Sequence, residues 1–278
     1  MTAAAPGHTA MRPLSAFPAR ARAKLAGVFA DIDDTLSTNG RLSAQAYGAM
    51  ERLREAGLMV VPITGRPAGW CDHIARMWPV DGVVGENGAF YFRYDQTQRK
   101  LIKRFMASER ERTENRRRLM ALKKTILAEV PGAAVASDQL YREADLAIDF
   151  CEDVAPLSRA AVNRIVALFE AAGARAKVSS IHVNGWFGTY DKLTMTRIMM
   201  KECFDLDLDL DAVKARFVFV GDSPNDAPMF GYFPHSVGVA NVRAFADDEM
   251  PAWPVYVTEA RAGAGFAQVA AAIVAARA

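Results

Sequence analysis

Two acidic clusters in the sequence have the composition of a divalent-cation site. Asp31, Asp33 and Asp34 fall within four consecutive residues, and Asp222 and Asp226 lie close together near the other end of the chain. Carboxylates this close together repel one another unless a cation neutralises them. Carboxylate oxygen is also a ligand that Mg²⁺ prefers. For each cluster taken alone, an aspartate-rich turn or helix cap is the alternative interpretation.

A hydroxyl residue and a lysine stand between these clusters in the sequence. Thr64-Gly65-Arg66-Pro67 places a hydroxyl and exposed backbone N–H groups before a helix, which is typical of a phosphate-binding corner. A threonine cap followed by proline is equally common at an ordinary helix start. Lys192 opens a later helix, where an ammonium could neutralise both phosphate and carboxylate charge. Taken by itself, a surface lysine is the ordinary interpretation.

The elements around these groups predict that they meet. Each polar group follows a short apolar run or opens the next helical segment, and apolar runs of this length suit buried parallel strands. The predicted strands and helices of this part are residues 26–32, 43–56, 58–64, 67–78, 80–84, 191–204, 216–220, 236–239, 255–258 and 265–276. Alternation of strand and helix predicts an α/β fold with a parallel sheet. Ligands bind such sheets at the carboxyl ends of the strands, so we expect the acidic clusters, Thr64 and Lys192 to share one edge.

The middle of the chain has a different pattern, which predicts an inserted α+β domain. Strands at 89–94 and 100–105 form a hairpin, and helices and further strands follow without parallel-type alternation. We therefore expect residues 1–22 to be a loose N-terminal extension. Residues 23–88 and 189–278 then form the two parts of one core domain, and residues 89–188 form the domain inserted between them.

Composition limits the partners and the location. The chain has 278 residues, 51% of them hydrophobic, and a formal net charge of only +2. Glutamates interrupt the basic stretch at 110–124, so we expect a solvated helix face and no nucleic-acid partner. No run of about 18 apolar residues predicts a membrane span. Three widely spaced cysteines predict free thiols, and we expect a cytoplasmic protein. The sequence makes no prediction of the oligomeric state.

The polar groups resemble, in order, the motifs of the haloacid dehalogenase superfamily of phosphohydrolases. The matching segments are Asp31-x-Asp33-x-Thr35, Thr64, Lys192 and Gly221-Asp222-x-x-Asn225-Asp226. An insertion between the second and third motifs is similar to the Cof-type IIB members, as is Glu86-Asn87-Gly88 before it. The resemblance implies an α/β Rossmann-like three-layer core with a parallel sheet and an inserted α+β domain of the C2 cap type.

The resemblance also implies a role for each motif residue. Asp31 is the expected nucleophile, and Asp33 is the expected acid and base. Mg²⁺ is expected on Asp31, the main-chain carbonyl of Asp33 and Asp222, with Asp226 beside a metal-bound water or Lys192. The phosphoryl oxygens are expected to bind Thr64, Gly65, Lys192 and Asn225.

The implied activity is hydrolysis of a small phosphorylated metabolite, by resemblance a sugar phosphate, through an aspartyl phosphate. Arg66, Asn87, Asn184 and Trp186 are the expected substrate contacts. Asn184 could hydrogen-bond to a sugar and Trp186 could stack on one, although a cap-sheet residue and a hinge aromatic are the alternatives.

Three alternative functions remain at this point. A phosphosugar mutase of the phosphomannomutase type would share the core chemistry and require a sugar bisphosphate. An aspartyl-phosphate signalling or binding module would gather similar residues on one doubly wound unit, without a large insertion. A catalytically inactive relative would bind ligand only.

Overall fold

The centre of the molecule is a six-stranded parallel sheet. The computed structural model describes residues 11–179 and 181–277. The strand order is β1 (Arg12–Pro13), β15 (Tyr256–Val257), β14 (Ser236–Gly238), β13 (Phe217–Gly221), β2 (Gly27–Ala30) and β5 (Met59–Pro62). Every neighbouring pair is parallel. All residues of β2 and β13 are buried, as expected for apolar strands covered on both faces.

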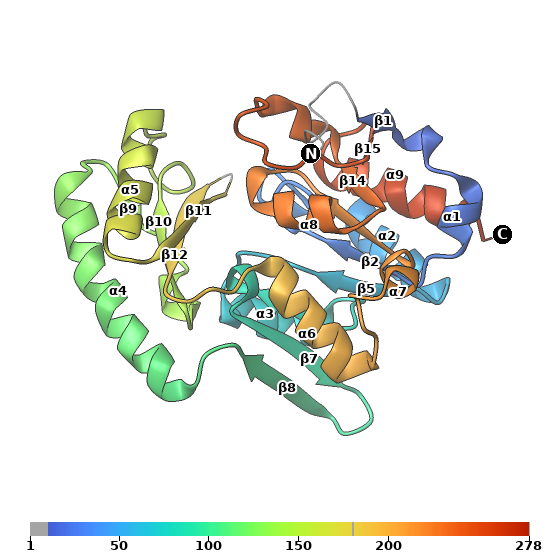
Figure 1. Ribbon diagram of the computed structural model, residues 1–278, viewed down its shortest axis with the longest axis horizontal. Coiled ribbons are helices and arrows are strands. Elements are labelled where there is room, and N and C mark those ends of the chain that lie inside the picture. The colour runs from blue at the N-terminus through green and yellow to red at the C-terminus, as the bar shows by residue number, and fades with distance from the viewer. Residues whose placement is uncertain (1–10, 180, 278) are drawn as a thin grey trace.

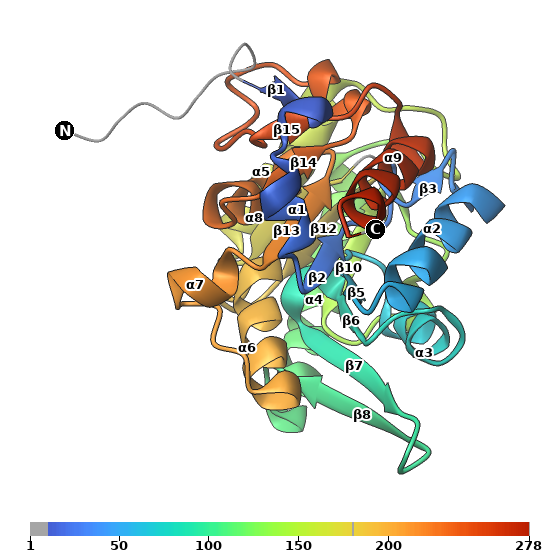
Figure 2. The ribbon, with the colours of Figure 1, turned by 90° about the vertical axis from the view of Figure 1, so that its right-hand side faces the viewer.

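Helices cover both faces of this sheet (Figure 2). One apolar core joins the sheet to α1 (Ala19–Ala23), α2 (Ala44–Glu55), α3 (Ala68–Met77) and α9 (Ala262–Ala275). A second core joins the opposite face to α6 (Lys192–Phe204) and α8 (Ala227–Tyr232), with the short α7 (Asp211–Lys214) nearby. The predicted α/β fold with a three-layer core is therefore confirmed.

The N-terminal prediction needs a correction. Residues 1–10 lie outside the described residues, but residues 11–22 are not a loose extension. Arg12 pairs with Tyr256 in the sheet, and the ring of Phe17 stacks on that of Tyr256 at 4.7 Å. α1 packs beside α9. A two-residue edge strand is too short to give a periodic sequence signal, which is why the prediction failed.

The predicted hairpin continues the core. β7 (Phe90–Asp95) pairs antiparallel with β8 (Lys100–Phe105) and with β6 (Val83–Gly85). Val84 in turn bridges Ile63, which follows β5. Because the hairpin is attached in this way, we propose that the inserted domain begins after β8 and not at residue 89.

The inserted domain, here called the cap, forms the separate lobe at the left of Figure 1. Its four-stranded antiparallel sheet has the order β11 (Arg175–Val178), β12 (His182–Trp186), β10 (Asp145–Asp149) and β9 (Ala134–Val135). Two helices, α4 (Glu109–Glu129) and α5 (Arg159–Ala171), pack on one face of this sheet. The antiparallel sheet and its helices match the expected α+β module.

The alternation of side chains in the cap strands places polar groups toward the core. Leu146, Ile148 and Val183 face the two helices. Because successive strand residues point to opposite faces, Asp145, Asp149, His182 and Asn184 lie on the other face. On the helix-facing side the position of Gly185 requires glycine, since a Cβ there would lie 2.1 Å from the Phe169 ring. The cap sheet therefore presents a polar face to the core.

The remaining elements are short. They are the hairpin of β3 (Ser37–Thr38) and β4 (Arg41–Leu42) and the 3-10 turns Leu14–Ala16, Glu86–Gly88, Gln139–Tyr141, Pro224–Asp226 and Ala240–Ala244. Among the described helices, none is long and apolar enough to cross a membrane. The expected cytoplasmic location and absence of a nucleic-acid partner stay predictions.

Candidate active site

Three buried carboxylates meet where β2 and β13 end. The N–H of Asp31 donates to the Val220 carbonyl at 2.9 Å, which fixes the end of β2 against β13. Asp31, Asp222 and Asp226 each offer a carboxylate oxygen, and these atoms lie within 4.8 Å of one another. The carboxylates lie together as predicted from the parallel sheet.

Asp226 is fixed by its own loop. Its Oδ2 accepts the N–H of Asp222 at 3.0 Å and that of Ser223 at 3.4 Å. Gly221 makes this possible, because a Cβ at that position would lie 2.5 Å from the same oxygen. Oδ1 of Asp226 accepts a hydrogen bond from Lys192. Both oxygens are thus engaged, which favours the expected position beside Lys192 over direct metal ligation.

Lys192 is the charged centre of the site and not a surface lysine. Its side chain is 2% exposed, and Nζ lies 2.6 Å from Oδ1 of Asp31 and 2.8 Å from Oδ1 of Asp226. Lys192 is the first residue of α6, whose N-cap, Asp191, accepts the N–H of Thr194 at 2.8 Å. Burial alone would lower the pKa of Lys192. The charges and hydrogen bonds of Asp226 and Asp31 raise the pKa by more than burial lowers it, so the pKa lies above its usual value. The side chain therefore stays charged.

The electrostatics of these groups call for an additional cation. Burial raises the pKa of Asp31 to about 8; Lys192 opposes this rise, while Asp226 and Asp33 add to it. Burial, followed by Asp31 and Asp226, raises the pKa of Asp222 well above its usual range. One ammonium cannot balance three buried carboxylates. A divalent cation would fit, because it would supply the missing charge to an all-oxygen donor set.

Asp222 is oriented by two neighbours from different parts of the chain. Its Oδ1 accepts the Thr35 hydroxyl at 2.9 Å, and its Oδ2 accepts Nδ2 of Asn241 at 3.2 Å. Asn241 also donates to the carbonyl of Asp34 at 2.9 Å. Asn241 lies outside the sequence motifs, so no spacing pointed to it. Its amide, together with the Thr35 hydroxyl, fixes the orientation of the Asp222 carboxylate.

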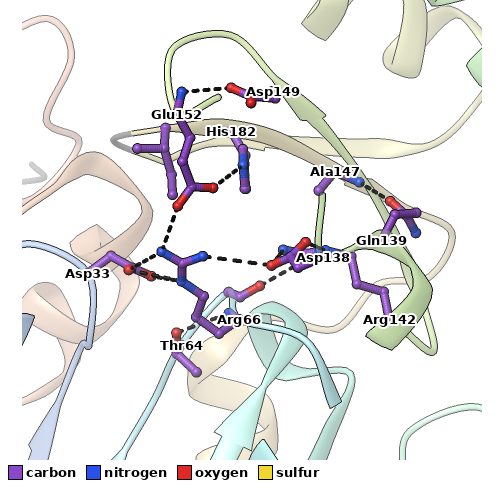
Figure 3. Close-up of polar contacts among 12 residues, drawn as sticks. Asp33, Thr64, Arg66, Asp138, Gln139, Arg142, Ala147, Asp149, Glu152 and His182 are labelled. Atoms are coloured by element: carbon purple, nitrogen blue, oxygen red, sulfur yellow. Dashed lines mark hydrogen bonds and ion pairs between the residues drawn. The ribbon is translucent and has the colours of Figure 1, made fainter. Parts of the chain in front are cut away.

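Asp33 is held by Arg66. Nε of Arg66 lies 3.0 Å from each Asp33 carboxylate oxygen, and Nη2 lies 2.8 Å from Oδ1 (Figure 3). Arg66 was expected to contact substrate, but here it fixes the carboxylate expected to act as acid and base. Thr64 is fully buried just before it, and its hydroxyl accepts the Arg66 N–H at 3.0 Å. The segment from Thr64 to Arg66, which was predicted to bind phosphate, thus sets the orientation of Asp33.

A small cavity lies over Asp31 and is closed by the cap. Its volume is about 20 Å³, which is room for about one water molecule. The core contributes Asp31, Asp33, Gly65, Arg66, Ser223 and Asn225, and the cap contributes Arg142, Ser179, Ile181, His182 and Asn184. Gly65 and Asn225, which were predicted to bind phosphate, line this cavity. The polar face of the cap sheet forms its roof.

The predicted substrate residues divide into three groups. Asn184 lines the cavity and donates to Oδ2 of Asp145 at 3.0 Å. Asn87 is buried in a left-handed conformation with φ 54°, beside Gly65 and away from the cavity lining. The stacking role of Trp186 is wrong, because its ring is 1% exposed and stacks on Tyr190 with the centroids 5.7 Å apart. Trp186 stands at the end of β12, within the main apolar core.

Arg142 and Glu86, for which the sequence predicted no such role, attach the cap to the core. Arg142 of the cap donates to the Gly65 carbonyl at 3.0 Å and to buried Asp138 and Asp145. Glu86 of the core accepts the N–H groups that follow Arg142, including that of Ala144 at 2.6 Å. Arg142 follows a 3-10 turn, where no periodic pattern marks it.

A wide groove begins on the other side of Asp33. Its volume is about 920 Å³, and Trp70, Met77, Trp78 and Tyr141 give it a mainly apolar lining. Trp70 is 42% exposed, and the Arg66 guanidinium lies over its ring at 4.4 Å. A ligand group attached near Asp33 could extend into this groove.

Residues 28–114 match the family model of the haloacid dehalogenase-like hydrolases. This segment holds the acidic motif of Asp31 and the Thr64 corner. Over these residues the resemblance inferred from the motifs is therefore confirmed by the family model. Among curated proteins, none matches the chain.

Several solved structures have the same fold. A Thermoplasma acidophilum protein aligns with a TM-score of 0.66 at 20% identity, over 90% of this chain and 98% of its own. A Plasmodium vivax protein described as a HAD/COF-like hydrolase aligns with a TM-score of 0.63 at 17% identity, over 90% and 96%. The Synechocystis sucrose-phosphatase, solved with sucrose and phosphate, aligns with a TM-score of 0.59 at 13% identity, over 90% and 98%. The fold of core plus cap is therefore shared along nearly the whole chain.

Proposed function

We propose that this protein is a Mg²⁺-dependent phosphatase that hydrolyses a small phosphorylated metabolite, a sugar phosphate, through an aspartyl phosphate on Asp31. The observation that carries the proposal is the buried Lys192 ammonium, 2.6 Å from Asp31 and 2.8 Å from Asp226. A buried cation beside a carboxylate nucleophile suits a reaction in which negative charge approaches a phosphate.

The metal site follows from the donor set. Asp31 and Asp222 would hold the ion with their side chains, and Asp33 would hold it with its main-chain carbonyl. Mg²⁺ suits this site because the donors are hard oxygens, and neither cysteine nor histidine belongs to the buried acidic group. The bound ion would supply charge neutralisation between the nucleophile and the phosphate.

In the first half of the reaction, a carboxylate oxygen of Asp31 attacks phosphorus, and the bond from phosphorus to the leaving oxygen breaks. Protonated Asp33 gives its proton to that oxygen, so the leaving group departs as a neutral alcohol. The phosphoryl group stays on Asp31. A carboxylate nucleophile thereby divides one difficult displacement into two easier ones.

In the second half, the Asp33 carboxylate takes a proton from water, and the water oxygen attacks phosphorus. The bond between phosphorus and Asp31 breaks, which releases inorganic phosphate and restores the Asp31 carboxylate. Asp33 is again protonated for the next cycle. General acid–base help of this kind contributes roughly 10²- to 10⁴-fold.

The transferring phosphoryl oxygens would bind close to the cavity over Asp31. We assign them to Lys192, the Thr64–Gly65 corner and Asn225, because Gly65 and Asn225 line that cavity and Lys192 contacts Asp31, which also lines it. These groups would stabilise the charge that spreads over the phosphoryl group in the transition state.

The leaving group would lie between Asp33 and the cap. Asn184 and the cap face offer hydrogen-bonding groups, and the exposed ring of Trp70 offers a stacking surface in the neighbouring groove. Both features suit a sugar, and the similar sucrose-phosphatase fold adds support. The inserted cap also favours a phosphatase over a single-unit aspartyl-phosphate signalling module.

The test is a screen of phosphorylated metabolites with and without Mg²⁺, which follows phosphate release. We expect Mg²⁺-dependent release from one or more sugar phosphates and none with Asp31→Asn. Turnover that requires added sugar bisphosphate would instead indicate a mutase. Normal turnover by a correctly folded Asp31→Asn variant would refute the nucleophile.

A further inference from the structure

We propose that Glu152 of the cap is a positioning residue, which makes the orientation of Asp33 depend on closure of the cap. Glu152 lies in the loop that follows β10 and forms an ion pair with Arg66 of the core. The inference rests on the proposed function, in which Asp33 moves the proton at the leaving oxygen.

The guanidinium of Arg66 joins carboxylates from both domains (Figure 3). Its Nη2 donates to Oδ1 of Asp33 at 2.8 Å and to Oε1 of Glu152 at 3.3 Å. Its Nη1 lies 3.7 Å from Oδ2 of Asp138, a second cap residue. Of the carboxylates around Arg66 named here, Asp33 belongs to the core, whereas Glu152 and Asp138 belong to the cap.

The loop that carries Glu152 is fixed from within the cap. Asp149 is buried, and its carboxylate accepts the N–H groups of Cys151, Glu152 and Asp153 at 2.9, 2.8 and 2.8 Å. On the other side, Nε2 of His182 lies 2.9 Å from Oε2 of Glu152. The glutamate is therefore held at both its backbone and its carboxylate.

The charge of Glu152 is maintained by the same neighbours. His182 and, to a lesser degree, Arg66 together lower the pKa of Glu152 to about 2 against the opposing effect of burial. Glu152 is thus ionised at neutral pH and attracts Arg66 whenever the cap is closed. A charged partner with one fixed position can select one orientation of a guanidinium.

Orientation matters because Arg66 holds Asp33 by several hydrogen bonds at once. If the cap moved away, Arg66 would lose both cap carboxylates and could turn together with Asp33. A small displacement of a catalytic group can cost about 10²-fold in rate. Glu152 would therefore hold Asp33 in one orientation only when the cap is closed. In that state the cap also excludes bulk water from the reaction.

Attachment of the cap does not depend on Glu152 alone. Arg142 binds the Gly65 carbonyl, and Glu86 accepts backbone N–H groups of the cap. Removing the Glu152 charge leaves these contacts in place. A variant of Glu152 therefore separates positioning of Asp33 from simple attachment of the cap.

The test compares Glu152→Gln with Asp153→Asn. The second variant is the control, because it removes the charge of an exposed carboxylate on the same loop. Each enzyme is assayed on the most active sugar phosphate of the screen and on p-nitrophenyl phosphate, whose leaving group departs without a proton. For Glu152→Gln we expect kcat/KM on the sugar phosphate to fall about 10- to 100-fold. On p-nitrophenyl phosphate we expect kcat/KM to fall less than about threefold, because this parameter reports formation of the aspartyl phosphate, a step in which this leaving group needs no acid. Asp153→Asn should match the wild type on both substrates.

Equal losses on the two substrates would overturn the inference, because they would indicate a merely structural role for Glu152. Unchanged kcat/KM on both substrates would also overturn it. Hydrogen exchange of the metal-free protein gives a second readout. We expect faster exchange in residues 65–70 for Glu152→Gln but not for Asp153→Asn, and identical exchange in the two variants would also count against the inference. Wild-type protein that hydrolyses neither substrate would refute the proposed function itself.

Discussion

Nζ of Lys192 lies 2.6 Å from Oδ1 of Asp31, although 161 positions separate the two residues in the sequence. The contact exists because β2 carries Asp31 to the edge of the sheet at which α6 begins. Lys192 also binds Asp226, so a single side chain joins the two acidic motifs. Several expected outcomes depend on this arrangement.

Replacing Lys192 with methionine should lower kcat about 10²- to 10³-fold, because the transferring phosphoryl group loses a preorganised positive charge. Steady-state assays at saturating Mg²⁺ measure the effect. Lys201→Met is the matched control, since Lys201 lies on the same helix and is 58% exposed in a pair with Asp205. A Lys192→Met enzyme within tenfold of the wild-type rate would remove Lys192 from the mechanism.

Replacing Asp33 with asparagine should leave Mg²⁺ binding largely intact, because the expected ligand from this residue is its main-chain carbonyl. Turnover of sugar phosphate should fall roughly 10²- to 10⁴-fold as acid–base help is lost. Calorimetry of Mg²⁺ binding and phosphate-release assays report the two properties separately. A nearly wild-type rate would contradict the role of Asp33.

Removal of the divalent cation should abolish activity and lower thermal stability. The buried Asp31, Asp222 and Asp226 repel one another without it, and an ion present at 100 times its Kd adds about 2.7 kcal/mol to the free energy of unfolding. Melting curves with EDTA and with added Mg²⁺ measure this difference. In Asp222→Asn the added stability should be much smaller, and an undiminished gain would exclude Asp222 as a ligand.

Replacing Arg142 with methionine should lower the free energy of unfolding by about 3 to 5 kcal/mol, since buried Asp138 and Asp145 lose their partner. Arg116→Met is the control, because Arg116 forms an exposed pair with Glu143 and should change the free energy of unfolding by less than about 1 kcal/mol. Urea denaturation compares the two variants. Equal effects would show that the Arg142 cluster adds no more stability than a surface pair.

His235 should make folding sensitive to mild acid. Burial lowers the pKa of His235, whose ring packs on Phe17 with the centroids 5.0 Å apart. The unfolded chain then binds a proton at a higher pH than the folded protein does. The stability that His235 contributes is therefore present above its unfolded pKa of 6.5 and is lost as pH falls through the lower folded value. Melting temperatures across this range should fall less in His235→Phe, and identical pH profiles would contradict the prediction.

Much of the core and of the site could be predicted from local sequence. Apolar runs that end in aspartate, as before Asp31 and Asp222, mark buried strands directly. Alternation with helices then requires a parallel sheet, and a parallel sheet brings the strand ends to one edge. For this reason the meeting of Asp31, Asp222 and Lys192 followed from the order of elements alone.

The contacts between the cap and the core could not be predicted in the same way. Arg66 stands in a phosphate-binding corner, and its sequence context suggested a substrate contact. Its actual partners, Asp33 and Glu152, depend on how the cap lies over the core. Nothing in the spacing of residues encodes that arrangement.

Burial also decided two assignments that composition left open. Trp186 has the side chain expected of a sugar-stacking residue, but packing against Tyr190 removes it from the surface. Residues 12–13 form an edge strand because Tyr256 and Val257 lie beside them, and two residues carry no period of their own. Both errors arose from tertiary contacts that local patterns do not contain.

The pairing of β2 with β13 has a consequence for folding during synthesis. Gly27 lies opposite Phe217, so β2 can pair with β13 only after most of the chain has left the ribosome. All strands of the cap lie between Ala134 and Trp186 and are complete earlier. Because contacts that are local in sequence close faster than distant ones, we expect the cap sheet that covers Asp31 to form before the pairing of β2 with β13 that holds Asp31 in place.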